Sequence, residues 1–268
     1  MINNIYDFSR MGIDTSIPGF YNDPAFLRME EKTPSFLNEY NKFVFGKTYT
    51  EEYLLYAKKK IDIVSKILFD ELSKTKRNGA CIDIAQVLML ILEKEGIWSC
   101  MFDGSMTIEY HKDLNIENAY YHTVDSGDFS SAHAWIAAPP YKIIDLSIYL
   151  QEYESNEKQY IPKYILEENV TKAKIQAIDI ISPEAALHFK CSLEDLLDVY
   201  FRNNTSILEF IKYFPPVYVQ SNKIKIKYIA LHGGASDGNL ETVKCLNFCG
   251  RTPFELYVDK IKPELKNI

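Results

Sequence analysis

The stretch Asn78–Gly96, NGACIDIAQVLMLILEKEG, predicts a helix that is apolar on almost every side. A helix without a polar face belongs in the interior of a protein. Asn78 is a residue type that caps helix starts, and Gly96 stands where a C-terminal glycine cap is typical. We therefore expect a buried central helix and interpret the rest of the chain around it.

The segments on either side of this helix indicate an α+β protein. Thr50 is a typical N-cap, and apolar residues follow it at helical spacing from Leu54 to Leu72. From Ile97 to Ser147, short segments rich in Tyr, Ile, Val and Trp alternate with turn residues, which is typical of strands. Two helices followed by several strands favour the α+β class.

We expect three parts along the chain. Residues 1–49 are a turn-rich lead-in with short helices, residues 50–150 are the core, and a polar stretch at 151–159 opens a C-terminal extension, 151–268. The extension is predicted to be mixed α/β, with helix starts at Ser182, Ser192 and Ser206 and a hairpin over Val217–Leu231. No role for the extension follows from its sequence.

Composition excludes several classes of protein. The chain has 268 residues, of which 47% are hydrophobic and 25% charged, as in ordinary globular proteins. Its net charge of −7 argues against nucleic acid as a partner, because nucleic-acid binding needs a basic surface.

Five scattered cysteines favour a reducing compartment over a disulfide scaffold. We expect neither a signal peptide nor a membrane span, and hence a cytoplasmic protein; export by a system that reads other signals stays open.

Cys81 is the first residue with a chemical role in this pattern. With Asn78 as the N-cap, Cys81 lies in the first turn of the central helix. There the helix dipole and the unpaired backbone N–H groups stabilise a thiolate, which makes the sulfur a better nucleophile at neutral pH. The same N–H groups are suited to hold an oxyanion.

His133 and Asp145 complete the pattern of a thiol-based triad. His133 lies in a predicted strand, Ala132–Ala137, and Asp145 in the next, Tyr141–Leu146. An imidazole pairs with the thiol and protonates the leaving group, while a carboxylate fixes the tautomer of the imidazole. Pro139-Pro140 predicts an antiparallel turn between the strands. A plain two-residue turn would place His133 and Asp145 on opposite faces, so the pairing requires a bulge or an odd connection.

These residues resemble the transglutaminase-like superfamily of papain-type thiol enzymes. NGACIDIA at Asn78–Ala85 is similar to that family's Gly-x-Cys followed by an acidic or polar residue and Ala, and Glu95–Ile97, His133-Ala134-Trp135 and Ile143-Ile144-Asp145 follow in the family order. The resemblance covers roughly residues 50 to 147. It implies a papain/transglutaminase-like core, in which a central helix presents Cys81 against an antiparallel sheet that presents His133 and Asp145.

Two features depart from the family pattern. Many members carry a tryptophan before the cysteine that helps form the oxyanion hole, whereas Trp98 and Trp135 both follow Cys81. The second oxyanion donor is therefore unassigned. Polar segments at Lys112–Asn118 and Asp125–Ser131 also lengthen the interval between Cys81 and His133, either as loops that shape a cleft or as tolerated insertions.

The pattern predicts a cysteine-dependent enzyme that acts on amide bonds of a protein or peptide substrate through a thioester. If water resolves the thioester, the enzyme is a peptidase or a glutamine deamidase. If a lysine amine resolves it, the enzyme is a cross-linking transglutaminase. We favour hydrolysis. An arylamine acetyltransferase-like acyl transferase and a noncatalytic protein-binding module that keeps the fold are the alternatives. The oligomeric state does not follow from the sequence.

Other candidate residues carry weaker signals. His122 is the main competitor of His133 as the base but lacks the Ala-Trp sequel, and Cys100 is interpreted as a core residue. Cys245 and Cys249 lack further ligands at zinc spacing, so we expect no metal site. The Gly233-Gly234 loop has no Lys-Ser/Thr after it, so we expect no nucleotide cofactor.

Overall fold

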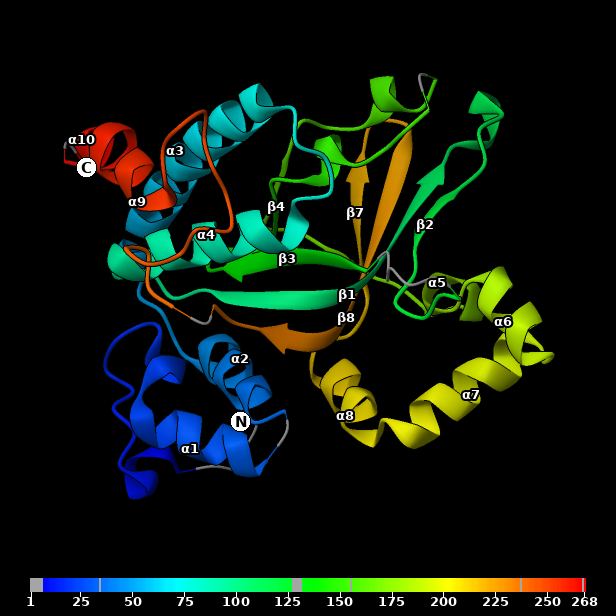
Figure 1. The fold of residues 1–268 in the computed structure, drawn as a ribbon, viewed down its shortest axis with the longest axis horizontal. Helices are drawn as coiled ribbons and strands as arrows, with labels where there is room; N and C mark the ends of the chain where they lie inside the picture. The colour runs from blue at the N-terminus through cyan, green and yellow to red at the C-terminus, as the bar shows by residue number, and fades with distance from the viewer. Residues whose placement is uncertain (1–6, 34, 127–131, 155, 237, 267) are drawn as a thin grey trace.

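The predicted central helix is present as α4 (Cys81–Lys94) in a computed structural model of the chain (Figure 1). The structure describes residues 7–33, 35–126, 132–154, 156–236, 238–266 and 268. From Val87 to Leu92 every residue of α4 is buried, while Ile82 at its first turn is 48% exposed. The helix is therefore central, as predicted, and it reaches the surface at its two ends, at Ile82 and at Lys94.

The protein is α+β, as the order of its predicted elements indicated. The helices before α4 are two short 3-10 turns, η1 (Phe8–Met11) and η2 (Phe20–Asn22), followed by α1 (Pro24–Lys32), α2 (Leu37–Gly46) and α3 (Glu51–Thr75). Thr50 caps α3 through its side chain, as expected.

One curled antiparallel sheet follows these helices along the chain. Its strands are β1 (Cys100–Tyr110), β2 (Ala119–Tyr121), β3 (His133–Ala138), β4 (Tyr141–Asp145), β5 (Ile165–Glu167), β6 (Thr171–Lys172), β7 (Val217–Ser221) and β8 (Ile224–Gly234). The order is β5-β4-β3-β1-β8-β7-β6, and β2 pairs with β1 beyond the start of β3. The β7–β8 hairpin predicted from Val217 onward is confirmed.

The remaining helices and turns lie in or after the strand region. They are η3 (Lys112–Leu114), η4 (Ile148–Leu150), η5 (Lys158–Tyr160), α5 (Ala177–Ile180), α6 (Pro183–Phe189), α7 (Leu193–Asn203), α8 (Thr205–Tyr213), α9 (Pro253–Leu256), the π-helical turn Tyr257–Ile261 and α10 (Lys262–Leu265). Ser182 and Ser192 cap α6 and α7 as predicted. The start expected at Ser206 was placed too late, because α8 begins at Thr205 after Asn204.

Helices cover both faces of the sheet. α4 packs on β3 and β1 through the face that carries Ala134 and Ile136. Trp135 alternates to the opposite face, where Phe102 contacts Phe45 of α2 and Phe210 of α8. In Figure 1, α4 and α2 accordingly lie on opposite sides of the β3–β1–β8 strands.

The C-terminal segment is built into this same sheet. β8 pairs with β1 along almost its whole length, so strands from residues 151–268 lie beside strands from residues 50–150. The division at residue 150 stays a prediction. In the described part of the chain, no helix is both long enough and apolar enough to cross a membrane.

Candidate functional site

The structure brings His133 and Asp145 into direct contact. Nε2 of His133 lies 2.7 Å from Oδ2 of Asp145, and both side chains are fully buried. The pairing of Ala138 with Tyr141 shifts by one residue before Ile136 pairs with Ile144. Without that shift Asp145 would face away from His133, so the bulge required by the sequence is present.

The Asp145 carboxylate is held by a complete set of donors. Oδ2 also accepts a hydrogen bond from the Tyr228 hydroxyl at 2.9 Å. Oδ1 accepts from the backbone N–H and hydroxyl of Ser147, both at 2.9 Å, and from the N–H of Ile148 at 3.0 Å. Burial opposes ionisation, but His133 and these donors outweigh it and hold the pKa of Asp145 below its ordinary value. The carboxylate is therefore fixed as an anion.

Cys81 is the first residue of α4, and the predicted N-cap was wrong. Ala80 occupies the cap position, and among the described residues no side chain caps this helix start. Gly79 takes a left-handed conformation, φ +67°, and donates its N–H to the carbonyl of Leu150 at 3.1 Å. This turn separates Asn78 from the helix, yet Cys81 stays in the first turn as expected. The first N–H groups of α4 have no partner within the helix.

The Cys81 thiol and the His133 imidazole affect each other's ionisation. Burial disfavours the thiolate, but the interaction with His133 outweighs it and lowers the pKa of Cys81 below its ordinary value. Burial likewise disfavours the imidazolium, but Asp145 and then Cys81 raise the pKa of His133 to about 10. Nδ1 of His133 is buried without a fully formed hydrogen bond in the described part of the chain. It is the ring nitrogen left for the thiol.

Aromatic side chains enclose the imidazole. The rings of Tyr121 and Trp135 lie 5.9 Å and 6.4 Å from that of His133, and Tyr228 lies at 6.4 Å. The sulfur of Cys81 lies 4.0 Å from the carbonyl oxygen of Ala132. Cys81 as a whole is 7% exposed. The three side chains of the predicted triad are thus buried, and burial strengthens the electrostatic interactions between them. Residues 127–131 of the predicted polar loop lie outside the described residues.

The competing residues lie elsewhere. The ring of His122 stacks on that of Tyr120 at 5.6 Å. Burial lowers the pKa of His122, although nearby carboxylates that include Asp179 and Glu184 oppose this shift. Trp98 packs against Phe43 near the N-terminal helices, so it does not replace the family's upstream tryptophan. Cys100 is fully buried, as predicted for a core residue.

In the described part of the chain, Cys245 and Cys249 do not belong to a group of metal ligands. The thiol of Cys245 approaches the backbone carbonyl of Asp83 at 3.8 Å, and Cys249 is exposed. Across the described ranges, no group of three or more His, Cys, Asp or Glu side chains is arranged to hold an ion.

Three residues that hold Asp145 were not predicted, namely Ser147, Ile148 and Tyr228. Asp145-Leu146-Ser147 forms an Asx-type turn, and a local Asp-x-Ser pattern at a strand end is a usable signal for it. The sequence predicted Tyr228 only as part of the hairpin over Val217–Leu231. Tyr228 lies 83 positions from Asp145, and nothing local indicates that β8 brings its hydroxyl to the carboxylate.

Comparison with protein families, curated proteins and solved structures finds no match to this chain. The residues and their geometry are therefore the basis for assigning a function.

Proposed function

We propose that the protein is a cysteine-dependent amide hydrolase acting on proteins or peptides, with Cys81 as nucleophile, His133 as base and acid, and Asp145 as the residue that orients His133. The observation that carries this proposal is the 2.7 Å contact of His133 Nε2 with Asp145 Oδ2, together with the interaction of His133 with Cys81 that lowers the pKa of the thiol despite its burial. A structural cysteine in an apolar setting has a raised pKa instead, as Cys100 does.

The proposed reaction begins with the Cys81 thiolate and the His133 imidazolium. The sulfur attacks the amide carbonyl, a C–S bond forms, and the carbonyl oxygen becomes an oxyanion near the free N–H groups of the α4 start. His133 then donates its Nδ1 proton to the leaving nitrogen, the C–N bond breaks, and an amine departs from a thioester. Asp145, which accepts from Nε2, keeps that nitrogen protonated and leaves Nδ1 for proton transfer.

Water completes the cycle in this proposal. His133 accepts a proton from water, the resulting oxygen attacks the thioester, and the C–S bond breaks to release a carboxylic acid and the thiolate. A main-chain amide gives proteolysis and a glutamine side chain gives deamidation. A papain/transglutaminase-like core is part of the proposal, and the packing of α4 on β3 with Cys81 near His133 supports it.

Mass spectrometry of a panel of proteins and peptides, incubated with the wild type or with Cys81→Ala, tests the proposal. Cleaved or deamidated products that need Cys81 are the expected result. Cys191→Ala is the matched control because Cys191 is an exposed thiol, and it should leave the products unchanged.

Other outcomes of the same test contradict hydrolysis. Cross-linked products would mean that an amine resolves the thioester. Acetylation of Cys81 by acetyl-coenzyme A would indicate an arylamine acetyltransferase-like reaction. If no product depends on Cys81 and iodoacetamide modifies Cys81 no faster than Cys191 at neutral pH, the protein is a binding module with an inert thiol.

A further inference from the structure

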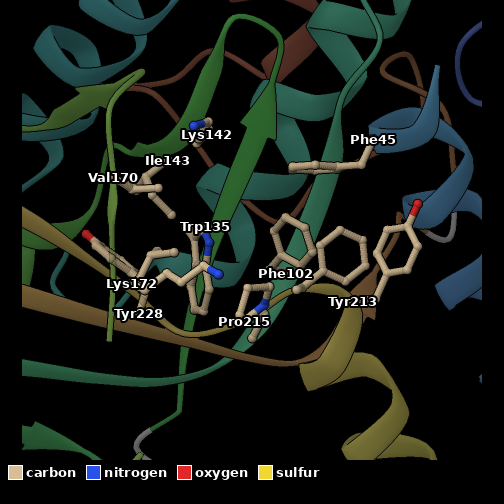
Figure 2. Close-up of a pocket in the computed structure, with 13 residues that line it drawn as sticks. Phe45, Phe102, Trp135, Lys142, Ile143, Val170, Lys172, Tyr213, Pro215 and Tyr228 are labelled. Carbon is tan, nitrogen blue, oxygen red and sulfur yellow. The ribbon is translucent and has the colours of Figure 1, made fainter. Parts of the chain in front are cut away.

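A cavity lies on the sheet face opposite α4. It has a volume of about 310 Å³ and lies between the sheet and the C-terminal ends of α2 and α8 (Figure 2). Tyr228 and Trp135 line it, and the hydroxyl of Tyr228 donates to Asp145. The cavity is therefore next to the Cys81–His133–Asp145 arrangement but does not include any of those three residues.

Six of the 13 residues that line the cavity are aromatic, and five more are aliphatic or proline. The rings of Phe45 and Phe214 lie 5.0 Å apart, those of Phe102 and Trp135 lie 6.0 Å apart, and those of Trp135 and Tyr228 lie 5.0 Å apart. Figure 2 shows Phe45, Phe102 and Tyr213 on one side, with Ile143 and Val170 across from them. A space of this size with apolar walls is typical of a small-molecule site, and it suits an aliphatic or aromatic body.

The charged side chains that line the cavity are both positive. Lys142 of β4 and Lys172 of β6 are both exposed, and none of the 13 lining residues is acidic. Lys66 and Lys94, by contrast, have carboxylate partners. Within the described residues, neither Lys142 nor Lys172 makes an ion pair. Their charges are available to a ligand.

We propose that this cavity binds a small amphipathic carboxylate, with its apolar body between the aromatic walls and its anionic end at Lys142 and Lys172. The apolar body is retained by burial, and the two ammonium groups select an anion over a neutral or cationic molecule of the same shape. The inference stands on the cavity and its charges and is independent of the proposed amide hydrolysis.

Decanoate, below its micelle concentration, is a suitable probe, and decanol is its uncharged counterpart. The chain has two tryptophans, so Trp98→Phe leaves Trp135 as a single reporter in the cavity wall. We expect decanoate to change the Trp135 fluorescence saturably and calorimetry on the unmodified chain to give the same affinity. Decanol should bind at least about tenfold more weakly, since it has no charge contacts.

Two variants test the two halves of the proposal. The double variant Lys142→Gln/Lys172→Gln changes only exposed side chains. It should lower the affinity for decanoate about tenfold and leave the affinity for decanol unchanged. Ala230→Leu adds bulk to the lining and should weaken both probes. Lack of saturation, equal affinities for decanoate and decanol, or an unchanged decanoate affinity in the double lysine variant would each overturn the proposal. None of these readouts depends on catalytic turnover.

Discussion

Nε2 of His133 lies 2.7 Å from Oδ2 of Asp145, which leaves Nδ1 of the same ring for the Cys81 thiol. The carboxylate occupies one ring nitrogen, and the other, Nδ1, has no fully formed hydrogen bond among the described residues. Because Asp145 has four further hydrogen bonds from Tyr228, Ser147 and Ile148, the ring is held by an anion that is itself fixed. The imidazole thus has one defined orientation toward the start of α4.

Cys81 should react as a thiolate below the ordinary pKa of a thiol. The rate of iodoacetamide modification, followed by mass spectrometry, should rise with a midpoint below 9.0, the value from which the pKa of Cys81 is lowered. In His133→Asn, burial acts on the thiol without the opposing imidazolium, so the midpoint should move above 9.0. An unchanged midpoint in His133→Asn would show that the imidazole does not stabilise the thiolate.

Asp145→Asn should keep the shape of the site and remove its anion. The amide presents a donor or a neutral acceptor to Nε2, so the tautomer and charge of His133 are no longer fixed. In the proposed mechanism, kcat for a substrate found with the wild type should fall on the order of 10⁴-fold, as for the equivalent exchange in serine triads. Near-normal turnover, with folding verified by circular dichroism, would remove Asp145 from the proposed role.

Much of this arrangement follows from local sequence. A helix that is apolar on almost every side is expected to be buried, and a cysteine two residues after an Asn-Gly pair lies in its first turn even though the cap is Ala80 rather than Asn78. The turn at Pro139-Pro140 also predicts neighbouring antiparallel strands, and the need for a bulge follows from the alternation of side chains.

The rest depends on contacts that are distant in sequence. The pairing of β8 with β1 brings Tyr228 to Asp145, but neither strand carries a local signal for its partner. The same pairing brings strands from the 151–268 segment against β1. The cavity is equally non-local, because α2, β3, β4 and α8 each contribute part of its wall.

Tyr228→Phe should destabilise the protein by removing a hydrogen bond to a buried anion. The expected loss at neutral pH is about 1.5–3 kcal/mol in the free energy of unfolding, measured by urea denaturation. Because the pKa of Asp145 is lowered in the fold, its stabilising effect is lost as the pH falls, so the difference from wild type should shrink in acid.

Tyr49→Phe is the control for this measurement. The hydroxyl of Tyr49 donates to the neutral carbonyl of Val44 at 2.8 Å, so its removal should cost only about 0.5–1.5 kcal/mol. Equal losses for Tyr49→Phe and Tyr228→Phe would contradict a special contribution from the contact with Asp145.

Gly104→Ala should be strongly destabilising. Gly104 lies at the irregularity in the β1–β8 pairing, and a Cβ there would come within 2.0 Å of the backbone oxygen of Ile229. Backbone cannot move aside without breaking the pairing, so we expect a loss of about 3 kcal/mol or more. Gly12→Ala is a useful comparison, because nothing lies within 4 Å of its added carbon and only its left-handed φ of +73° is strained. A similar loss in both would mean that the close approach is relieved elsewhere.

Glu93→Gln should make the protein less sensitive to alkaline pH. Burial raises the pKa of Glu93 from 4.5 to about 8, so between these values the folded state binds a proton that the unfolded state has released. Stability should therefore fall as the pH rises, with a slope approaching about 1.4 kcal/mol per pH unit. Glu93→Gln removes this slope and should exceed wild type in thermal stability at about pH 9. Glu117→Gln changes an exposed carboxyl and should not raise the thermal stability at this pH. Parallel profiles of stability against pH for wild type and Glu93→Gln would contradict a raised pKa of Glu93 in the folded state.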